Sequence, residues 1–147
     1  STISSNSYLS KFNSLNPSIR VIQKACPLFV PLIEENWATT AVANQVAKTY
    51  LKSLTKEPLS VLVLGCTHYP IMEPLIQSVV GNSVKLISSG PAVSKTIKKF
   101  LYDNCLQNSL KKTSNSIFFV TDFPEKFNQL GRELIGRPLK NVQHIRF

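Results

Sequence analysis

The sequence predicts an α/β fold in which a parallel sheet lies between helices, as a three-layer αβα architecture. Short apolar runs alternate along the chain with segments whose apolar residues recur at helical spacing. The run at residues 59–64 is almost continuously apolar, which is typical of a strand covered on both faces. Strand–helix–strand repeats imply right-handed crossovers, and ligands of such sheets bind beyond the carboxyl ends of the strands.

In the first half of the chain we expect a short strand at residues 19–23 and an amphipathic helix at residues 36–54. The apolar face of that helix consists of Ala43, Ala47, Tyr50, Leu51 and Leu54. The strand at 59–64 follows. Pro70 and Pro74 suit the first turns of the next helix, and Gly81 suits its end.

In the second half we expect strands at residues 84–88, 117–121 and 142–147. Ser89-Gly90-Pro91 opens a helix whose apolar face consists of Val93, Ile97, Phe100 and Leu101. Residues 104–115 are polar and are predicted to form a loop. A last helix, which ends near Gly136, has an apolar stripe made of Phe123, Phe127, Leu130 and Leu134.

Composition limits the function classes. No apolar run is long enough to cross a bilayer, and the first ten residues lack the features of a signal peptide. The three cysteines form no paired pattern, so we expect a reducing compartment, the cytoplasm, rather than a disulfide scaffold. The net charge is +9, but the basic residues are scattered, which favours solvated helix faces over a nucleic-acid surface. We expect neither nucleic acid nor membrane as a partner.

The chemistry-bearing motif is Gly65-Cys66-Thr67-His68, directly after the apolar strand. This position places the Cys66 thiol at the ligand-binding edge of the sheet and at a helix entrance, where the pKa of a thiol is lowered. The Thr67 hydroxyl and N–H can hold a carboxylate, and His68 can exchange protons. Gly65 lets the backbone approach a ligand. Taken singly, the cysteine is also typical of a small buried residue, and the histidine of a structural one.

Residues 65–70, Gly-Cys-Thr-His-Tyr-Pro, resemble the second catalytic-cysteine motif of the glutamate racemases, members of the aspartate/glutamate racemase superfamily. Residues 25–34, Ala-Cys-Pro-Leu-Phe-Val-Pro-Leu-Ile-Glu, resemble another segment of that family. Thr2-Ile3 with Ser5 and Tyr8 resembles a third, and residues 86–90 resemble a fourth, with Ser88 in place of an acidic residue. The resemblance covers essentially the whole chain.

The resemblance implies a cofactor-independent isomerase that needs neither pyridoxal phosphate nor metal. Enzymes of this family interconvert L- and D-glutamate, and the D-glutamate serves peptidoglycan synthesis, hence cell wall biogenesis and cell shape. Two cysteines act on opposite faces of the substrate Cα. Cys66 matches the second cysteine and His68 its assisting histidine, while Glu34 matches an acidic residue near the site, where a carboxylate can orient His68. The alternative for Glu34 is a solvated charge just before the predicted helix. Thr67 and Thr2 match substrate-binding residues. Cys26 looks structural, and Cys105 has no assigned role.

The family's first catalytic cysteine and its Asp-Ser-Gly-x-Gly-Gly loop have no counterpart in the 147 residues. The chain also has no initiator Met, so we expect a piece of a longer protein or a processed product. By resemblance, residues 1–85 are the second racemase lobe, and residues 86–147 complete the first lobe of an incomplete two-lobe architecture. With one of two bases, the chain is expected to be inactive alone. Homo-oligomerisation is left open.

Three alternatives remain. The chain could belong to a superfamily racemase that acts on aspartate or a hydantoin. The +9 charge and the absence of the family's first catalytic cysteine are also compatible with a non-catalytic basic binding module. A metal site built from Cys66, His68 and another cysteine is a third reading, although Cys-x-His lacks the paired ligand spacing of zinc sites.

Overall fold

The computed structural model describes residues 3–108 and 116–146 and divides into two compact units, Ser1–Thr96 and Ile97–Phe147. Each unit contains one pair of parallel strands. In the first, β1 (Val61–Leu64) pairs with β2 (Lys85–Ser88), and in the second, β3 (Phe118–Val120) pairs with β4 (Val142–His144). The α/β class with parallel strands is confirmed. The division into lobes at residue 85 concerns a longer racemase and stays a prediction.

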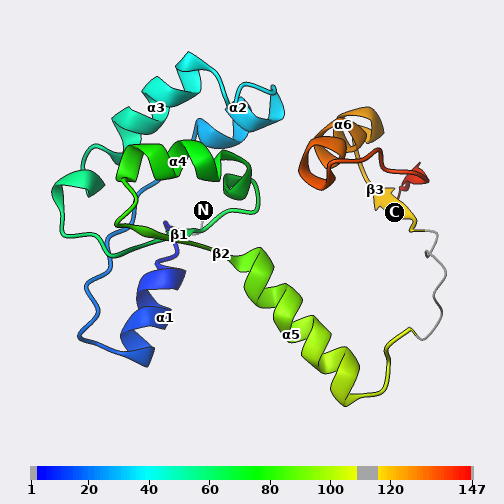
Figure 1. Cartoon of the computed structure of the whole chain (residues 1–147), viewed down its shortest axis with the longest axis horizontal. Helices are drawn as coiled ribbons and strands as arrows, with labels where there is room; N and C mark the ends of the chain where they lie inside the picture. Colours follow the sequence, from blue (N-terminus) through cyan, green and yellow to red (C-terminus); the bar gives the residue numbers. More distant parts are fainter. Residues whose placement is uncertain (1–2, 109–115, 147) are drawn as a thin grey trace. The chain divides into compact units, whose positions relative to one another are not determined.

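The first unit places its helices on both sides of β1 and β2. Figure 1 shows α2, α3 and α4 on one side of these strands and α1 on the other. The helical elements of this unit are α1 (Ser7–Leu15), α2 (Phe29–Glu34), α3 (Ala41–Leu51), η1 (Leu54–Lys56), η2 (Tyr69–Met72) and α4 (Glu73–Val80). Here η denotes a 3₁₀ helix.

The core of the first unit forms where α2, α3, η2 and α4 meet. Its most enclosed large side chains, each 1% exposed, are Phe29, Ile33, Met72 and Ile76. On α3, Ala43 and Ala47 are fully buried, and their small side chains allow close packing against α4. The predicted apolar face of this helix is therefore confirmed. The Thr40 side chain starts α3 by accepting a hydrogen bond from the Ala43 N–H at 3.3 Å.

Two predicted elements of this unit differ from the structure. Residues 19–23 form no strand, because no strand of the described residues pairs with them, and Ile19 and Ile22 are about 40% exposed. The helix predicted at 36–54 begins only at Ala41, because Thr40 caps it, and it ends at Leu51. Asn36 has a left-handed backbone, φ 61°, which no helix continues through.

The strand predicted at 59–64 exists as β1, but the prediction that both its faces are covered is wrong. Leu64 is 4% exposed, whereas Val61 is 43% exposed and Ile87 on β2 is 40% exposed. In this unit β1 has one neighbour, β2, with Leu64 in register with Ser88. The face of the sheet that carries Val61 is therefore less covered than the face that carries Leu64.

The other predicted helices and strands are present in the structure. Pro74 lies in the first turn of α4, and Gly81 ends that helix with φ 88°. In the second unit β3, β4 and α6 (Pro124–Ile135) form, and Gly136 ends α6 with φ 71°. β4 ends at His144 rather than near the end of the chain, and Phe123 precedes α6 and is 67% exposed. Helix α5 (Ser89–Asp103) opens at Ser89. Residues 104–108 of the predicted loop lack helix and strand, and the rest of it lies outside the described residues.

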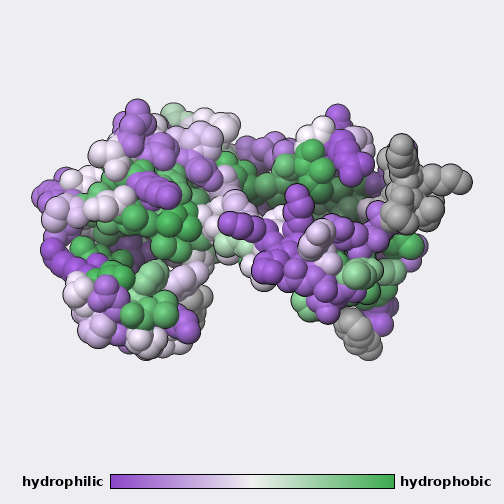
Figure 2. Space-filling model, turned by 60° about the horizontal axis from the view of Figure 1, so that its bottom comes forward, coloured by the Kyte–Doolittle hydropathy of each residue, from purple (hydrophilic) through white to green (hydrophobic). Residues whose placement is uncertain are grey.

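Apolar side chains also reach the surface, where Figure 2 shows them as green patches among hydrophilic residues. Helix α5 has no buried residue. Its apolar stripe of Val93, Ile97 and Phe100 is 53%, 53% and 58% exposed. An amphipathic helix with so open an apolar face normally packs against another element.

Gly131 of α6 touches Leu139 so closely that Gly131→Ala should destabilise the second unit. A Cβ at this position would lie 2.3 Å from Leu139 Cδ1 and 2.9 Å from its Cγ, and Leu139 is buried. Overpacking of this kind costs about 1–3 kcal/mol, which exceeds the roughly 1 kcal/mol that alanine gains over glycine in a helix. Urea unfolding monitored by far-ultraviolet circular dichroism measures the difference in unfolding free energy between the variant and the wild type.

The matched control is Gly90→Ala in α5, where an added Cβ meets nothing within 4 Å. This variant should be neutral or more stable by up to about 1 kcal/mol. Equal effects of the two substitutions would show that the Leu139 contact does not decide the outcome.

Candidate active site

The candidate site is built around the loop that leaves the carboxyl end of β1. Leu64 ends β1, and Gly65, Cys66, Thr67 and His68 form a bend before η2. The Cys66 carbonyl accepts a hydrogen bond from the Tyr69 N–H at 3.3 Å, which closes the bend. Cys66 was expected at the entrance to an α-helix, but a four-residue 3₁₀ helix intervenes and α4 begins only at Glu73.

The fold brings three of the predicted site residues together in space, with His68 between the other two. The Cys66 Sγ lies 3.9 Å from the His68 Nδ1, and the His68 Nε2 lies 3.6 Å from the Glu34 Oε1. The side chains of His68 and Glu34 are 32% and 38% exposed, so the group is open to solvent. Both contacts are longer than a tight hydrogen bond, and contacts of this kind commonly shorten when substrate binds. The arrangement can pass a proton between a thiol and an imidazole that a carboxylate orients.

Thr67 and Thr2 are placed differently. Thr67 is exposed, and its Oγ1 lies 3.5 Å from the same His68 Nδ1 that faces Cys66. Thr2 lies outside the described residues. Glu34 is the last residue of α2 rather than a charge just before the next helix, which begins at Ala41. Its negative charge therefore sits at the helix end that disfavours it.

Gly65 allows a close approach, but the approaching group is a protein side chain. A Cβ on Gly65 would lie 3.3 Å from Cε2 of Tyr8, which α1 carries. Tyr8 thus packs against the backbone beside Cys66. Sequence reasoning assigned no role to Tyr8, although it lies in one of the segments that resemble the family.

An aromatic cluster beside the loop was also missed. Tyr69 donates a hydrogen bond from its hydroxyl to the Cys26 carbonyl at 3.2 Å. The Tyr69 and Tyr50 rings both meet Phe29 edge-on, with ring centroids 5.3 and 5.6 Å away. Burial raises the pKa of Tyr69 to about 12, with smaller contributions from Cys26, Cys66 and Tyr50. No local sequence pattern indicates this cluster, because Phe29, Tyr50 and Tyr69 lie in three separate segments of the chain.

Cys26 is 6% exposed, and burial raises the pKa of its thiol to about 11 against a smaller lowering by Lys24. The structural role predicted for Cys26 agrees with this burial. Because its thiol is neutral at physiological pH, Cys26 is a poor base.

Alkylation by iodoacetamide at pH 8 should therefore modify Cys26 far more slowly than Cys105. Cys105 is exposed, and a pKa of about 11 in place of 9.0 lowers the thiolate fraction of Cys26 about 100-fold. Up to about pH 11 the rate at Cys26 should rise tenfold per pH unit. Mass spectrometry of the peptides measures each rate, and unfolding in urea should make the two cysteines similar. Rapid labelling of Cys26 in the folded chain would contradict its burial.

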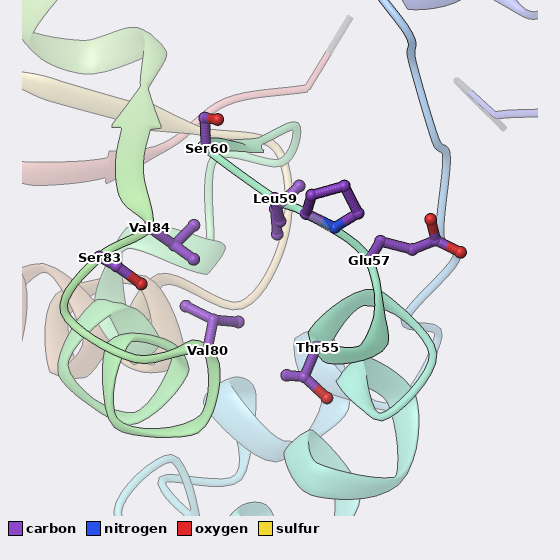
Figure 3. A pocket seen from close by; sticks show the side chains of 8 residues that line it. Thr55, Glu57, Leu59, Ser60, Val80, Ser83 and Val84 are labelled. Carbon is purple, nitrogen blue, oxygen red and sulfur yellow. The ribbon is translucent and has the colours of Figure 1, made fainter.

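Two surface cavities lie apart from this group. One, of about 470 Å³, opens at the amino ends of β1 and β2, where Figure 3 shows it bordered by Ser60, Val80 and Val84. The other, of about 390 Å³, is lined by Pro70, Glu73, Pro74 and Gln77. Neither is lined by Cys66 or His68. Within residues 3–108 and 116–146, no group of three or more cysteine, histidine or acidic residues is arranged to hold a metal ion.

None of the described helices has the length and apolarity that a membrane crossing requires.

Comparison with known proteins relates the chain to glutamate racemases. No family model matches the chain. The chain is 36% identical over 144 residues to the glutamate racemase of Geobacter metallireducens and 37% identical over 145 residues to that of Lactiplantibacillus plantarum. Each match covers 98% of this chain and 53% of the relative. The chain thus spans about half the length of the curated relatives it matches.

Solved structures agree. Glutamate racemase from Francisella tularensis, in complex with D-glutamate, superimposes on 99% of this chain with a TM-score of 0.88 and 34% identity, over 54% of its own length. The Thermus thermophilus glutamate racemase, in complex with beta-chloro-D-alanine, covers 84% of this chain with a TM-score of 0.74 and 35% identity. By sequence and by fold, the chain is therefore similar to the C-terminal part of the glutamate racemases over nearly its whole length.

Proposed function

We propose that this chain supplies one of the two acid/base groups of a cofactor-independent glutamate racemase. The observation that carries the proposal is the series Cys66, His68 and Glu34 at the carboxyl end of β1, in a chain related to glutamate racemases over 98% of its length. Ligands of parallel α/β proteins bind at this edge of the sheet. The D-glutamate complex of the Francisella enzyme supports a small amino acid as the ligand.

In the proposed mechanism the Cys66 thiolate removes the α-proton of L-glutamate from one face. His68, held by Glu34, accepts or returns the proton that the thiol carries between turnovers, and the N–H and hydroxyl of Thr67 bind a substrate carboxylate. Thr2 is proposed to bind substrate as well. Inversion requires a second acid on the opposite face of Cα, since a group that returns the proton to the same face regenerates the starting enantiomer.

We further propose that the second acid comes from a part of a racemase outside these 147 residues, and that residues 86–147 complete the lobe that carries it. The open apolar stripe of α5 supports this, because a helix with three apolar side chains more than half exposed requires a covering element. The expected occupant is the half of the relatives that this chain does not span. The resulting enzyme would act in the cytoplasm and supply D-glutamate for peptidoglycan.

The test compares the 147-residue chain alone with the same chain joined to the N-terminal half of the Geobacter metallireducens racemase. Circular dichroism of glutamate solutions measures racemisation. We expect no racemisation by the chain alone and racemisation by the joined protein. Racemisation by the chain alone would overturn the assignment of one base, and an inactive but folded joined protein would overturn the proposed activity. Parallel assays with L-aspartate distinguish a glutamate enzyme from a related aspartate enzyme.

A further inference from the structure

Tyr69, which follows the loop that carries Cys66 and His68, makes one hydrogen bond within that loop and one to a distant segment. The Tyr69 N–H donates to the Cys66 carbonyl at 3.3 Å, and the Tyr69 hydroxyl donates to the Cys26 carbonyl at 3.2 Å. Cys26 is 43 positions away in sequence and lies just before α2, the helix that ends at Glu34. Tyr69 thereby connects the loop of the proposed base to the segment that leads to Glu34.

The hydrogen bond of the Tyr69 hydroxyl, at 3.2 Å, is shorter than the 3.6 Å contact between His68 and Glu34. The Tyr69 ring packs edge-on against Phe29, which is 1% exposed, with ring planes at 79°. Its hydroxyl remains a protonated donor through the physiological range, because burial raises the pKa of Tyr69 to about 12. The contact between His68 and Glu34 spans 3.6 Å and is about one-third exposed, and exposed charge pairs hold geometry weakly.

We propose that Tyr69 is a positioning residue whose hydroxyl bond to the Cys26 carbonyl holds His68 beside Glu34 and so sets the separation between the His68 imidazole and the Cys66 thiol. This inference rests on the proposed function and deepens it. Without the hydroxyl, the loop at residues 65–68 keeps its connection to β1 but loses its polar connection to the segment before α2. His68 then moves relative to Glu34, and proton transfer with Cys66 slows because reacting groups misplaced by about 1 Å lose much of their rate.

The chain offers a matched control in Tyr50. Its ring also meets Phe29 edge-on, and its hydroxyl accepts a hydrogen bond from the Leu28 N–H at 3.4 Å. Tyr50→Phe therefore removes a hydroxyl contact with the same stretch of backbone as Tyr69→Phe does. Tyr50 belongs to α3, however, and is not adjacent in sequence to the loop at residues 65–68, as Tyr69 is. A merely structural role for these hydroxyls would give both variants the same effects.

The first test observes position directly, by nitrogen-15 NMR of the imidazoles in the 147-residue chain. The chain has two histidines, His68 and His144, and His144 lies in the second unit, where it serves as an internal reference. Tyr69→Phe should shift the His68 ring signals in the same direction as Glu34→Gln does, while Tyr50→Phe leaves them unchanged and His144 stays constant in all three. His68 signals that match the wild type in Tyr69→Phe, or that move equally in Tyr50→Phe, would overturn the inference.

The second test measures turnover in the protein joined to the N-terminal half of the Geobacter relative. Tyr69→Phe should lower kcat on the order of 10-fold and change KM less than about 2-fold, since substrate contacts are retained. In a Glu34→Gln background the same substitution should add less than about a 2-fold loss, because the partner of His68 is already gone. Full additivity of the two losses would overturn the inference. If the joined wild type is inactive, the proposed function fails, and the NMR result still decides the role of Tyr69.

Discussion

Replacing Cys66 with serine should lower the rate of α-proton exchange on L-glutamate by about 10²–10⁴-fold in the protein joined to the complementary half. A serine hydroxyl ionises far less readily than a thiol, so at neutral pH it cannot act as the base. The geometry of the site should survive, because Cys66 is only partly buried and its carbonyl bond to the Tyr69 N–H involves main-chain atoms. The effect is therefore expected in kcat rather than in folding.

Deuterium incorporation at Cα in D₂O, followed by proton NMR, measures this rate for each enantiomer. The loss should be largest for L-glutamate, on whose face Cys66 is proposed to act. Cys105→Ser is the matched control, because Cys105 is exposed and lies at the end of α5, away from the loop in sequence. Wild-type exchange rates in Cys66→Ser, with the protein folded, would eliminate Cys66 as the base.

Replacing Phe29 with alanine should lower the free energy of unfolding of the first unit by about 3–5 kcal/mol. Phe29 is 1% exposed and begins α2, and its ring is the common contact of Tyr50 and Tyr69. Alanine removes the buried ring and leaves a cavity that two large rings cannot easily fill. Because Tyr69 adjoins the loop at residues 65–68, the variant should also disturb the His68 position in the NMR experiment described above.

Urea unfolding monitored by circular dichroism measures this loss. Phe29→Leu should lose less, since it keeps much of the buried volume. Phe119→Ala provides a matched phenylalanine on the surface, because Phe119 is 57% exposed, and it should cost well under half as much. Equal losses for Phe29→Ala and Phe119→Ala would contradict the central place of Phe29 in the core.

The local elements were predictable where a pattern is long or a terminator is strong. The apolar repeat of α3 and the glycines that end α4 and α6 are signals carried within about a dozen residues. Helix α2 escaped prediction because six residues with Pro31 inside them show no clear period. The strand expected at residues 19–23 failed for a different reason, since a strand exists only where another strand satisfies its hydrogen bonds.

The candidate site also combines features that the local sequence predicts with features that depend on distant contacts. Cys66, Thr67 and His68 are consecutive, so their place after an apolar strand could be inferred from the sequence, and the resemblance added Glu34. The connections that make these residues a group are not local. His68 meets Glu34 across 34 positions, and Tyr69 reaches Cys26 across 43. No periodicity within either segment indicates that these atoms face each other.

The sequence by itself therefore determined the α/β class, several helix ends and the racemase relationship, because these depend on short-range patterns and on matched motifs. Only the tertiary structure decided which faces are covered, that Tyr8 packs beside Gly65, and that the Tyr69 hydroxyl bonds to the Cys26 carbonyl. Those outcomes depend on which distant segments pack together, and packing selects among contacts that a linear pattern leaves equally available.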